Sequence, residues 1–124
     1  MNIRENIITD YFNSWVQKDA SILDETFSPN VIYIESWGPA YKGIEQVKAW
    51  FTGWNKENTV IAWDIKEFLH DGSTSICEWY FKCDCDGNID GFNGVSIIVF
   101  DKSNKIELLK EFQSKIPNNY PYEK

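Results

Sequence analysis

Glu35 is the residue whose type and surroundings best fit catalysis, because it is a single carboxylate within the aromatic and glycine-containing segment 33–43. If the strand before it turns Val31, Tyr33 and Glu35 toward the interior, the carboxylate enters an apolar environment. Desolvation there raises the pKa of a carboxyl group toward the range that suits a general base. If the intervening isoleucines face inward instead, Glu35 is solvated, and the alternation of residue types favours neither face.

Three other groups contain side chains that can do chemistry, but each fits a structural role better. Residues 84–90 imitate the middle of an EF-hand loop, yet the first and last ligand positions are not acidic, so we predict a hairpin turn. Cys83 and Cys85 form a C-x-C pair with too few further ligands for zinc, and we expect no metal. His70 lies beside an Asp-Gly turn with no Ser or Cys partner identified nearby, so we interpret it as solvated.

The first half of the chain has the periodicity of helices that could position these groups. Apolar residues at spacings of three and four over 3–16 predict a helix of about four turns. Asp19 is placed to cap a short second helix, which residues 28–30 end with a Ser-Pro-Asn sequence. A strand is predicted over 31–36, and helical spacing returns over 44–55 for a third helix.

The second half of the chain has the period of two that is typical of strands. Runs rich in β-branched and aromatic residues occur near 59–69, 74–84, 91–101 and 105–114, separated by Asp-Gly, Asp-Gly and Ser-Asn turn signals. Sequential strands joined by such turns form an antiparallel meander. Helices first and long strands later predict an α+β fold, in which a curved sheet wraps around a few helices.

Length and composition limit the class and the location of the protein. At 124 residues and 14.5 kDa the chain fits one domain, 1–124, and an aromatic share of 16% favours a thick core or a cavity for an organic ligand. The net charge of -7 opposes nucleic acid and anionic membrane partners. No apolar run approaches a membrane span, and three cysteines, an odd number, fit a reducing compartment, so we expect a cytoplasmic protein.

The motifs along the chain follow a recognisable order. A first helix ending Trp-Val-Gln-Lys-Asp is followed by residues 23–27, Pro-Asn-Val-Ile, a strand, Trp-Gly-Pro-Ala-Tyr-Lys-Gly and a helix that opens Ile-Glu-Gln-Val. Near the end, Ile-Ile-Val-Phe-Asp and a turn precede a strand that contains Glu111 and Phe112. This order resembles the nuclear transport factor 2-like superfamily, in particular its SnoaL-like members. The resemblance implies a cone-shaped α+β barrel, with a curved antiparallel sheet wrapped around three N-terminal helices.

Within that superfamily, the delta-5-3-ketosteroid isomerases allow individual residues to be compared. Tyr11 precedes Asp19 by eight residues, as the isomerases' oxyanion-hole tyrosine precedes a similar Asp, and Glu35 falls where their general base falls. Their protonated Asp corresponds here to Ser96, a weaker hydrogen-bond donor. The resemblance implies that Glu35 takes a proton beside a carbonyl, or activates water, while Tyr11 and Ser96 donate hydrogen bonds to the oxygen that gains charge, with no cofactor.

The resemblance also implies which strand residues face a pocket. The inward positions carried over are Trp63, Ile65 and Glu67 on one strand and Cys77, Trp79 and Phe81 on the next. For most of the aromatic residues the alternative is core packing, and Glu67 and Glu111 are each either a second pocket carboxylate or part of an interface ion pair. The candidate ligand-binding residues are Trp15, Tyr33, Trp37, Trp54, Trp63, Glu67, Trp79 and Glu111.

Three functions are compatible with this interpretation. The first is a cofactor-free enzyme, such as an isomerase, cyclase or hydratase, acting on a small apolar or aromatic organic molecule. The second is a binding module in which Glu35 only orients the ligand, and the third is a protein-interaction domain that uses its exposed surface. A homodimer is expected in each case, because Ile76 and Tyr80 lie on the opposite face from Cys77 and its inward neighbours, and a sheet with two apolar faces needs a partner.

Overall fold

The structure, a computed structural model, describes residues 2–123. Helices precede most of the strands, as the periodicity predicts. In chain order the elements are α1 (Ile3–Gln17), the 3-10 helix η1 (Ala20–Ile22), α2 (Leu23–Thr26), β1 (Phe27–Ile34), β2 (Ala40–Lys42), α3 (Ile44–Glu57), β3 (Asn58–Asp71), β4 (Thr74–Cys85), β5 (Asn88–Phe100) and β6 (Ile106–Ser114).

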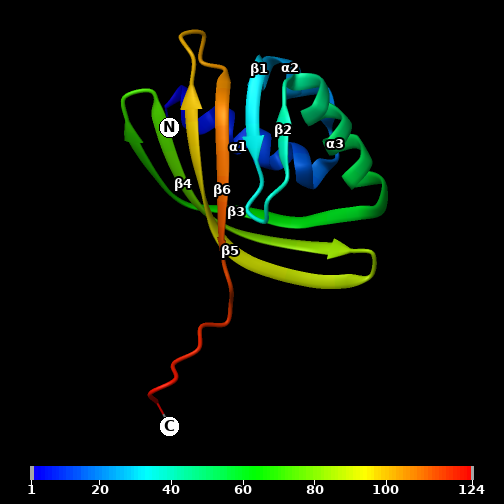
Figure 1. The fold of residues 1–124 in the computed structure, drawn as a ribbon, viewed down its shortest axis with the longest axis vertical. Helices are drawn as coiled ribbons and strands as arrows, with labels where there is room; N and C mark the ends of the chain where they lie inside the picture. The colour runs from blue at the N-terminus through cyan, green and yellow to red at the C-terminus, as the bar shows by residue number, and fades with distance from the viewer. Residues whose placement is uncertain (1, 124) are drawn as a thin grey trace.

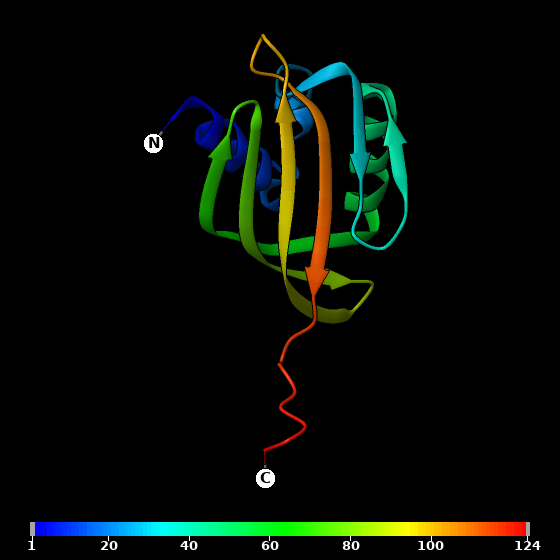
Figure 2. The same cartoon turned by 60° about the vertical axis from the view of Figure 1, so that its left-hand side comes forward.

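The strands form one six-stranded sheet in the order β2-β1-β6-β5-β4-β3. Neighbouring strands are antiparallel except β1 and β6, which pair in parallel. The sheet curves around the helices without closing on itself (Figure 1), and in the view of Figure 2 the helices lie behind the long strands. The predicted α+β, cone-like fold is confirmed, although its sheet is open and contains one parallel pair.

Local signals explain where the helices begin and end. The Asn2 side chain accepts a hydrogen bond from the backbone N–H of Glu5 at the start of α1, and Lys18, with a φ of 56°, ends the helix. Asp19 caps η1 by accepting from the N–H of Ser21, as predicted. Among the described residues, none of the helices is long and apolar enough to cross a membrane.

β1 starts at Phe27, before its predicted start, because tertiary pairing extends it. Phe27 is fully buried and pairs with Ile106 of β6. The register between the two strands breaks between Phe27 and Ile32, and Pro29, which has no N–H to donate, lies in that break. The Ser-Pro-Asn sequence predicted to end a helix is therefore part of an irregular strand.

A bulge in β3 changes which of its side chains face the helices. Ile65 pairs with Trp79, but the next pairs are Glu67 with Glu78 and Phe68 with Cys77, so Lys66 is an extra residue in the strand. Glu67 is consequently exposed and Phe68 packs against the core. The predicted inward position of Glu67 is wrong, because strict alternation does not include the bulge.

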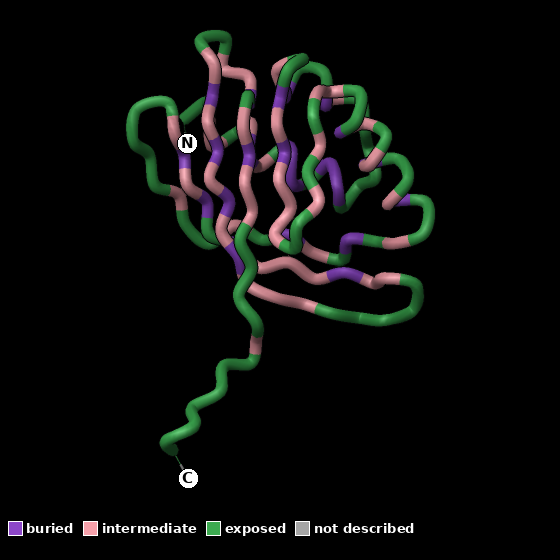
Figure 3. Tube along the Cα trace, viewed as in Figure 1, coloured by how far each residue is buried: buried purple, intermediate pink, exposed green. Residues whose placement is uncertain are grey.

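The core lies between the helices and the concave face of the sheet. Buried and less buried positions alternate along the central strands, whereas the segment after β6 is almost wholly exposed and extends away from the sheet (Figure 3). Trp79 is a central residue, because its ring lies over Gly94, its register partner on β5. A Cβ atom at position 94 would overlap the six-membered ring of Trp79, so glycine is required for this contact.

Candidate functional site

A cavity of about 420 Å³ opens between the helices and the sheet. Its walls come from α1, α3, the β1–β2 connection and strands β3 to β6, so nearly every element contributes. Most of the wall is aromatic, from Trp15, Trp37, Trp50, Trp54, Trp63, Trp79, Phe81 and Phe92. The carboxylates of Glu35, Asp90 and Glu111 also line it. Such a cavity, largely apolar with a few polar groups, is typical of sites for small organic molecules.

Glu35 faces the cavity because Val31 and Tyr33, which precede it at alternate positions, have no exposed surface. Its side chain is partly buried and accepts a 2.7 Å hydrogen bond from the hydroxyl of Tyr41. Burial raises the pKa of Glu35, while hydrogen bonds from Tyr41 and Trp37 partly offset that shift. Of the two orientations open at the level of the sequence, the structure has the inward one.

Glu111 is the second glutamate of the cavity, and its pKa is shifted more strongly than that of Glu35. It lies on β6 and accepts a 2.5 Å hydrogen bond from the hydroxyl of Tyr33, which in turn accepts a 2.7 Å hydrogen bond from Tyr11. Burial, with the negative charge of Glu35, raises the pKa of Glu111 to about 8, against the lowering effect of the Tyr33 hydrogen bond. At neutral pH Glu111 is therefore mostly protonated, and the pKa of Glu35 is the less strongly raised of the two.

The predicted oxyanion-stabilising residues lie behind the cavity wall. Tyr11 and Ser96 are both 0% exposed, and neither belongs to the described lining. The Tyr11 hydroxyl donates to Tyr33, and the Ser96 Oγ accepts a 2.9 Å hydrogen bond from the indole nitrogen of Trp79. Tyr33 is also fully buried and reaches the cavity through its bond to Glu111. In this arrangement the tyrosines support Glu111.

The structure also brings to the cavity residues that the sequence analysis did not assign to a ligand site. Trp50 lies within the range predicted for the third helix and stacks on Tyr41, with ring centroids 4.6 Å apart. Asp90 follows the Asp-Gly turn between β4 and β5 and belonged to the segment interpreted only as a turn. Helical spacing would have supported Trp50, but no local signal identifies Asp90 because its position depends on how the hairpin curves.

Cys83 and Cys85 line the cavity with their sulfur atoms 2.8 Å apart. Both are free, and burial is the main cause that raises the pKa of Cys83 to about 12. A thiol with such a pKa is a poor nucleophile at neutral pH. The described residues contain no group of three or more His, Cys, Asp and Glu side chains placed to hold a metal ion.

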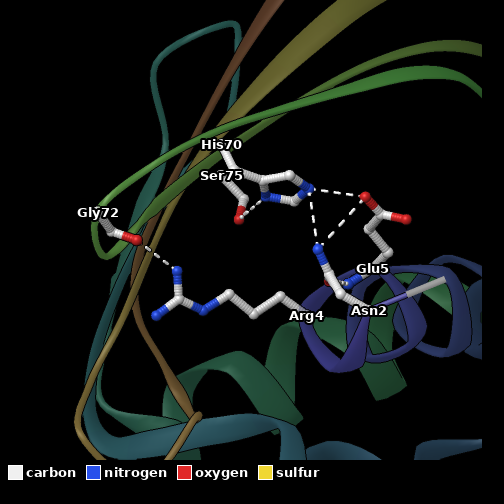
Figure 4. A network of polar contacts seen from close by, with 6 residues as sticks. All are labelled: Asn2, Arg4, Glu5, His70, Gly72 and Ser75. Atoms are coloured by element: carbon white, nitrogen blue, oxygen red, sulfur yellow. Dashed lines mark hydrogen bonds and ion pairs between the residues drawn. The ribbon is translucent and has the colours of Figure 1, made fainter.

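His70 has a partner that the sequence analysis missed. Its Nδ1 lies 2.8 Å from Oγ of Ser75, and its Nε2 lies 2.7 Å from Oε2 of Glu5 (Figure 4). Ser75 is the register partner of His70 across the β3–β4 hairpin, so the interpretation of His70 as merely solvated is wrong. The residue types are those of a hydrolase triad, but Ser75 is 0% exposed and no substrate could reach its hydroxyl.

This network ties the start of α1 to the hairpin. Arg4 donates to the backbone carbonyl of Gly72 and lies over the ring of Phe100, 5.2 Å from its centroid (Figure 4 shows the first of these contacts). The Nδ2 of Asn2 is 3.3 Å from His70 Nε2. We interpret the network as structural, since it fixes the helix that carries Tyr11 and Trp15 into the core.

The cavity carboxyl groups make a testable prediction about protonation. We expect the Glu111 carboxyl to titrate near pH 8 in a carbon-13 NMR experiment, with its resonance assigned by its loss in Glu111→Gln. The folded state then holds this proton at pH values where the unfolded chain, with a pKa of about 4.3, has released it. Stability should fall as pH rises from about 4.3 to 8, and Glu111→Gln should remove most of that dependence, leaving the smaller contribution of the raised pKa of Glu35. A Glu111 pKa near the unfolded value would contradict the burial argument.

The curved open sheet over helices, with a cavity between them, defines the class of nuclear transport factor 2-like folds. A family model described as the SnoaL-like domain matches residues 8–108, and the chain belongs to this family. The resemblance to SnoaL-like proteins that the motifs indicate is thereby confirmed. Among curated protein sequences, none matches the chain.

Solved structures share the fold at low sequence identity. An LEH-like epoxide hydrolase from M. tuberculosis has a TM-score of 0.80 at 12% identity, over 90% of this chain and 82% of that one. A nuclear transport factor 2-like protein of unknown function from Burkholderia pseudomallei has a TM-score of 0.77 at 12% identity, over 92% of each chain. A protein with a ketosteroid isomerase-like fold from Catenulispora acidiphila, in complex with trimethylamine, has a TM-score of 0.76 at 15% identity, over 86% and 83%. At these identities the likeness shows the fold alone.

Proposed function

We propose that the protein is a cofactor-independent enzyme that moves a proton on a small organic molecule held in the cavity. The reaction class is an isomerisation, cyclisation or hydration that begins with proton transfer between the substrate and a carboxyl group. The observation that carries the proposal is that Glu35 and Glu111 line one cavity with differently perturbed pKa values. Two titratable groups whose environments separate their pKa values are suited to acid and base roles.

In this mechanism Glu35 is the proton acceptor and Glu111 the proton donor. Glu111 is mostly protonated at neutral pH, so it can hydrogen-bond to a substrate oxygen that gains negative charge and then transfer its proton. Tyr33, itself held by Tyr11, stabilises the carboxylate that remains through its 2.5 Å hydrogen bond. The aromatic walls limit access of water, which strengthens these electrostatic interactions.

The likeness to known folds supports this reading without defining the substrate. One of the similar structures is an epoxide hydrolase and another is a complex with trimethylamine, so the fold accommodates both hydrolytic chemistry and a small bound molecule. The proposed proton transfer suggests a ketone with exchangeable protons as a substrate, and the similar hydrolase suggests a small epoxide. These are the two substrate types to examine first.

The test is proton exchange catalysed by the cavity. The protein is incubated in deuterium oxide with a panel of small ketones and enones, and deuterium incorporation next to the carbonyl is followed by NMR. We expect incorporation or isomerisation for at least one compound, faster than with an equal concentration of the Glu35→Gln variant. Equal rates for the two proteins with every ketone, together with no opening of small epoxides, would contradict the proposal.

A non-catalytic binding module is the second candidate. One observation favours it: Tyr11 and Ser96, the donors expected to stabilise an oxyanion, are buried behind the wall and do not line the cavity. In that case the aromatic lining holds a ligand while Glu35 and Glu111 orient it. The deuterium experiment distinguishes the two functions, because a binder protects its ligand from exchange and an enzyme accelerates exchange.

We also propose that the protein forms a homodimer through the outer face of β4 to β6. Ile76, Tyr80, Val95 and Ile97 are partly exposed on that face, and Phe112 is more exposed still. Apolar side chains exposed together on one face of a sheet are typical of an interface. Sedimentation equilibrium at micromolar concentration should give twice the chain mass of 14.5 kDa.

A substitution on that face should separate the subunits without unfolding them. Phe112→Glu adds a charge at an exposed position, so we expect it to give monomers, whereas Tyr122→Glu in the exposed C-terminal segment should not. A wild-type protein that sediments as a monomer would contradict the dimer, and the outer apolar residues would then lack a partner.

We propose a cytoplasmic location on the basis of the cysteines. Cys77, Cys83 and Cys85 are all free, and a reducing compartment keeps thiols in that state. Fractionation of cells that express the full chain, with thiol labelling before lysis, tests both the location and the thiol state.

A further inference from the structure

The cavity has a one-sided charge pattern. Glu35, Asp90 and Glu111 line it, and none of its lining residues within 2–123 is Lys, Arg or His. The whole chain has a net charge of -7, so no distant excess of positive charge compensates. An anionic ligand entering this cavity would lose its hydration without gaining a cationic partner, which is strongly unfavourable.

The aromatic walls also favour a cation. The faces of aromatic rings carry a negative quadrupole that attracts cations, and tryptophan attracts them more strongly than tyrosine or phenylalanine. Trp37, in the β1–β2 connection, is 71% exposed, and Trp50 and Trp54 on α3 are partly buried. Rings of this kind near carboxylates can replace the hydration shell of an organic cation, whose own methyl groups favour apolar contact. The ligand that satisfies both observations carries a positive charge on an apolar body.

We propose that the cavity binds a small organic cation that carries a substituted ammonium group. The ammonium group lies among the tryptophans and the carboxyl groups. This inference rests on the proposed function only in that both need a small molecule in the cavity; it specifies the charge of that molecule.

Binding of a cation is coupled to the protonation of Glu111. The titratable groups that face Glu111 are Glu35, Tyr33, Tyr11 and Tyr41, and its neighbours in the lining include no basic residue within 2–123. A bound cation favours the ionised carboxylate and so lowers the pKa of Glu111 from about 8. Affinity for a cation should therefore rise with pH up to about 8 and level off above it, with protons released on binding below that pH.

The experiment compares choline with 3,3-dimethylbutan-1-ol, its neutral isostere of the same shape. Binding is followed by quenching of tryptophan fluorescence and by calorimetry at pH 6.5 and pH 9. Choline has a permanent charge, so its own ionisation does not contribute. We expect choline to bind roughly tenfold more tightly than the alcohol at pH 9, and this preference to shrink at pH 6.5. Calorimetry in two buffers with different ionisation enthalpies should detect the released proton.

Two variants locate the interaction. Glu111→Gln should lower the affinity for choline by roughly tenfold at pH 9 and remove its pH dependence, with little effect on the alcohol. Trp37→Leu, at an exposed position that tolerates change, should weaken choline alone by roughly two- to fivefold.

The outcomes distinguish this inference from the proposed function. If the alcohol binds as tightly as choline or more tightly, the inference fails, while the acid–base function of a neutral substrate stands. If neither compound binds, the inference also fails, and the deuterium-exchange experiment alone decides the proposed function. A preference for choline that persists unchanged in Glu111→Gln and in Trp37→Leu overturns the placement of the cation in this cavity.

Discussion

Replacing Glu35 by Gln is expected to lower turnover by about 10²- to 10⁴-fold, the usual contribution of a general base. The amide keeps the size of the side chain and can still accept a hydrogen bond from Tyr41, but it cannot take a proton. The free energy of unfolding should stay the same or rise slightly, because a partly buried charge is removed. The measurement is the rate constant for the best compound of the ketone panel, beside a thermal unfolding curve.

The control is Glu67→Gln, which removes a carboxylate from the exposed face of β3. This variant should keep full activity, because the bulge turns Glu67 away from the cavity. Tyr41→Phe gives an intermediate case. It removes a hydrogen bond that lowers the pKa of Glu35, so the acidic limb of the pH–rate profile should move to higher pH. If Glu35→Gln unfolds the protein by several kcal/mol, the carboxylate is a structural partner and the mechanism loses its base.

Trp79→Ala is expected to destabilise the protein by roughly 3–5 kcal/mol. The ring is 2% exposed, makes edge contacts with Phe12 and Trp63, and donates its N–H to Ser96. Truncation leaves a void in the core and an unpartnered hydroxyl at Ser96. Because one side of Trp79 also lines the cavity, a loss at the lower end of that range indicates that water already occupies the space beside it. Urea unfolding gives the value.

Gly94→Ala provides a double-mutant test of the same contact. The added Cβ overlaps the ring of Trp79, so the single variant should lose roughly 1–3 kcal/mol by overpacking. In the Trp79→Ala background the overlap is gone, and Gly94→Ala should cost almost nothing. The control is Gly53→Ala on α3, where nothing lies within 4 Å of the added Cβ, and which should be neutral or stabilising. Additive losses in the double variant would contradict the packing of Trp79 over Gly94.

Much of the fold could be predicted from the sequence because it depends on local signals. The stripe from Ile3 to Val16 predicts α1 closely, and the Asp-Gly pairs at 71–72 and 86–87 fall at the turns of the β3–β4–β5 hairpins. Backbone conformation at such turns is set by the residues themselves, as the positive φ values of Asp86 and Gly87 show. The start of β1 was less predictable, since its pairing partner lies far along the chain in β6.

Much of the candidate site could not be predicted in the same way. Glu35 could be selected by its type and neighbours, but its inward orientation depends on the burial of Val31 and Tyr33. The link from Tyr11 through Tyr33 to Glu111 joins residues from α1, β1 and β6, and no sequence spacing relates them. Their hydrogen bonds arise only when the helix packs against the sheet.

The sequence by itself determined the order of the elements, the meander and the presence of an acidic residue among aromatic ones. These features follow from periodicity, turn chemistry and composition, which act over a few residues. Only the tertiary structure decided that Glu111 joins Glu35 in the cavity, while Glu67 points to solvent. One physical reason is that the extra residue Lys66 turns the side chains that follow it in β3 to the opposite face of the sheet. The other is that the long-range pairing of β6 with β1 and β5 brings Glu111 beside Tyr33.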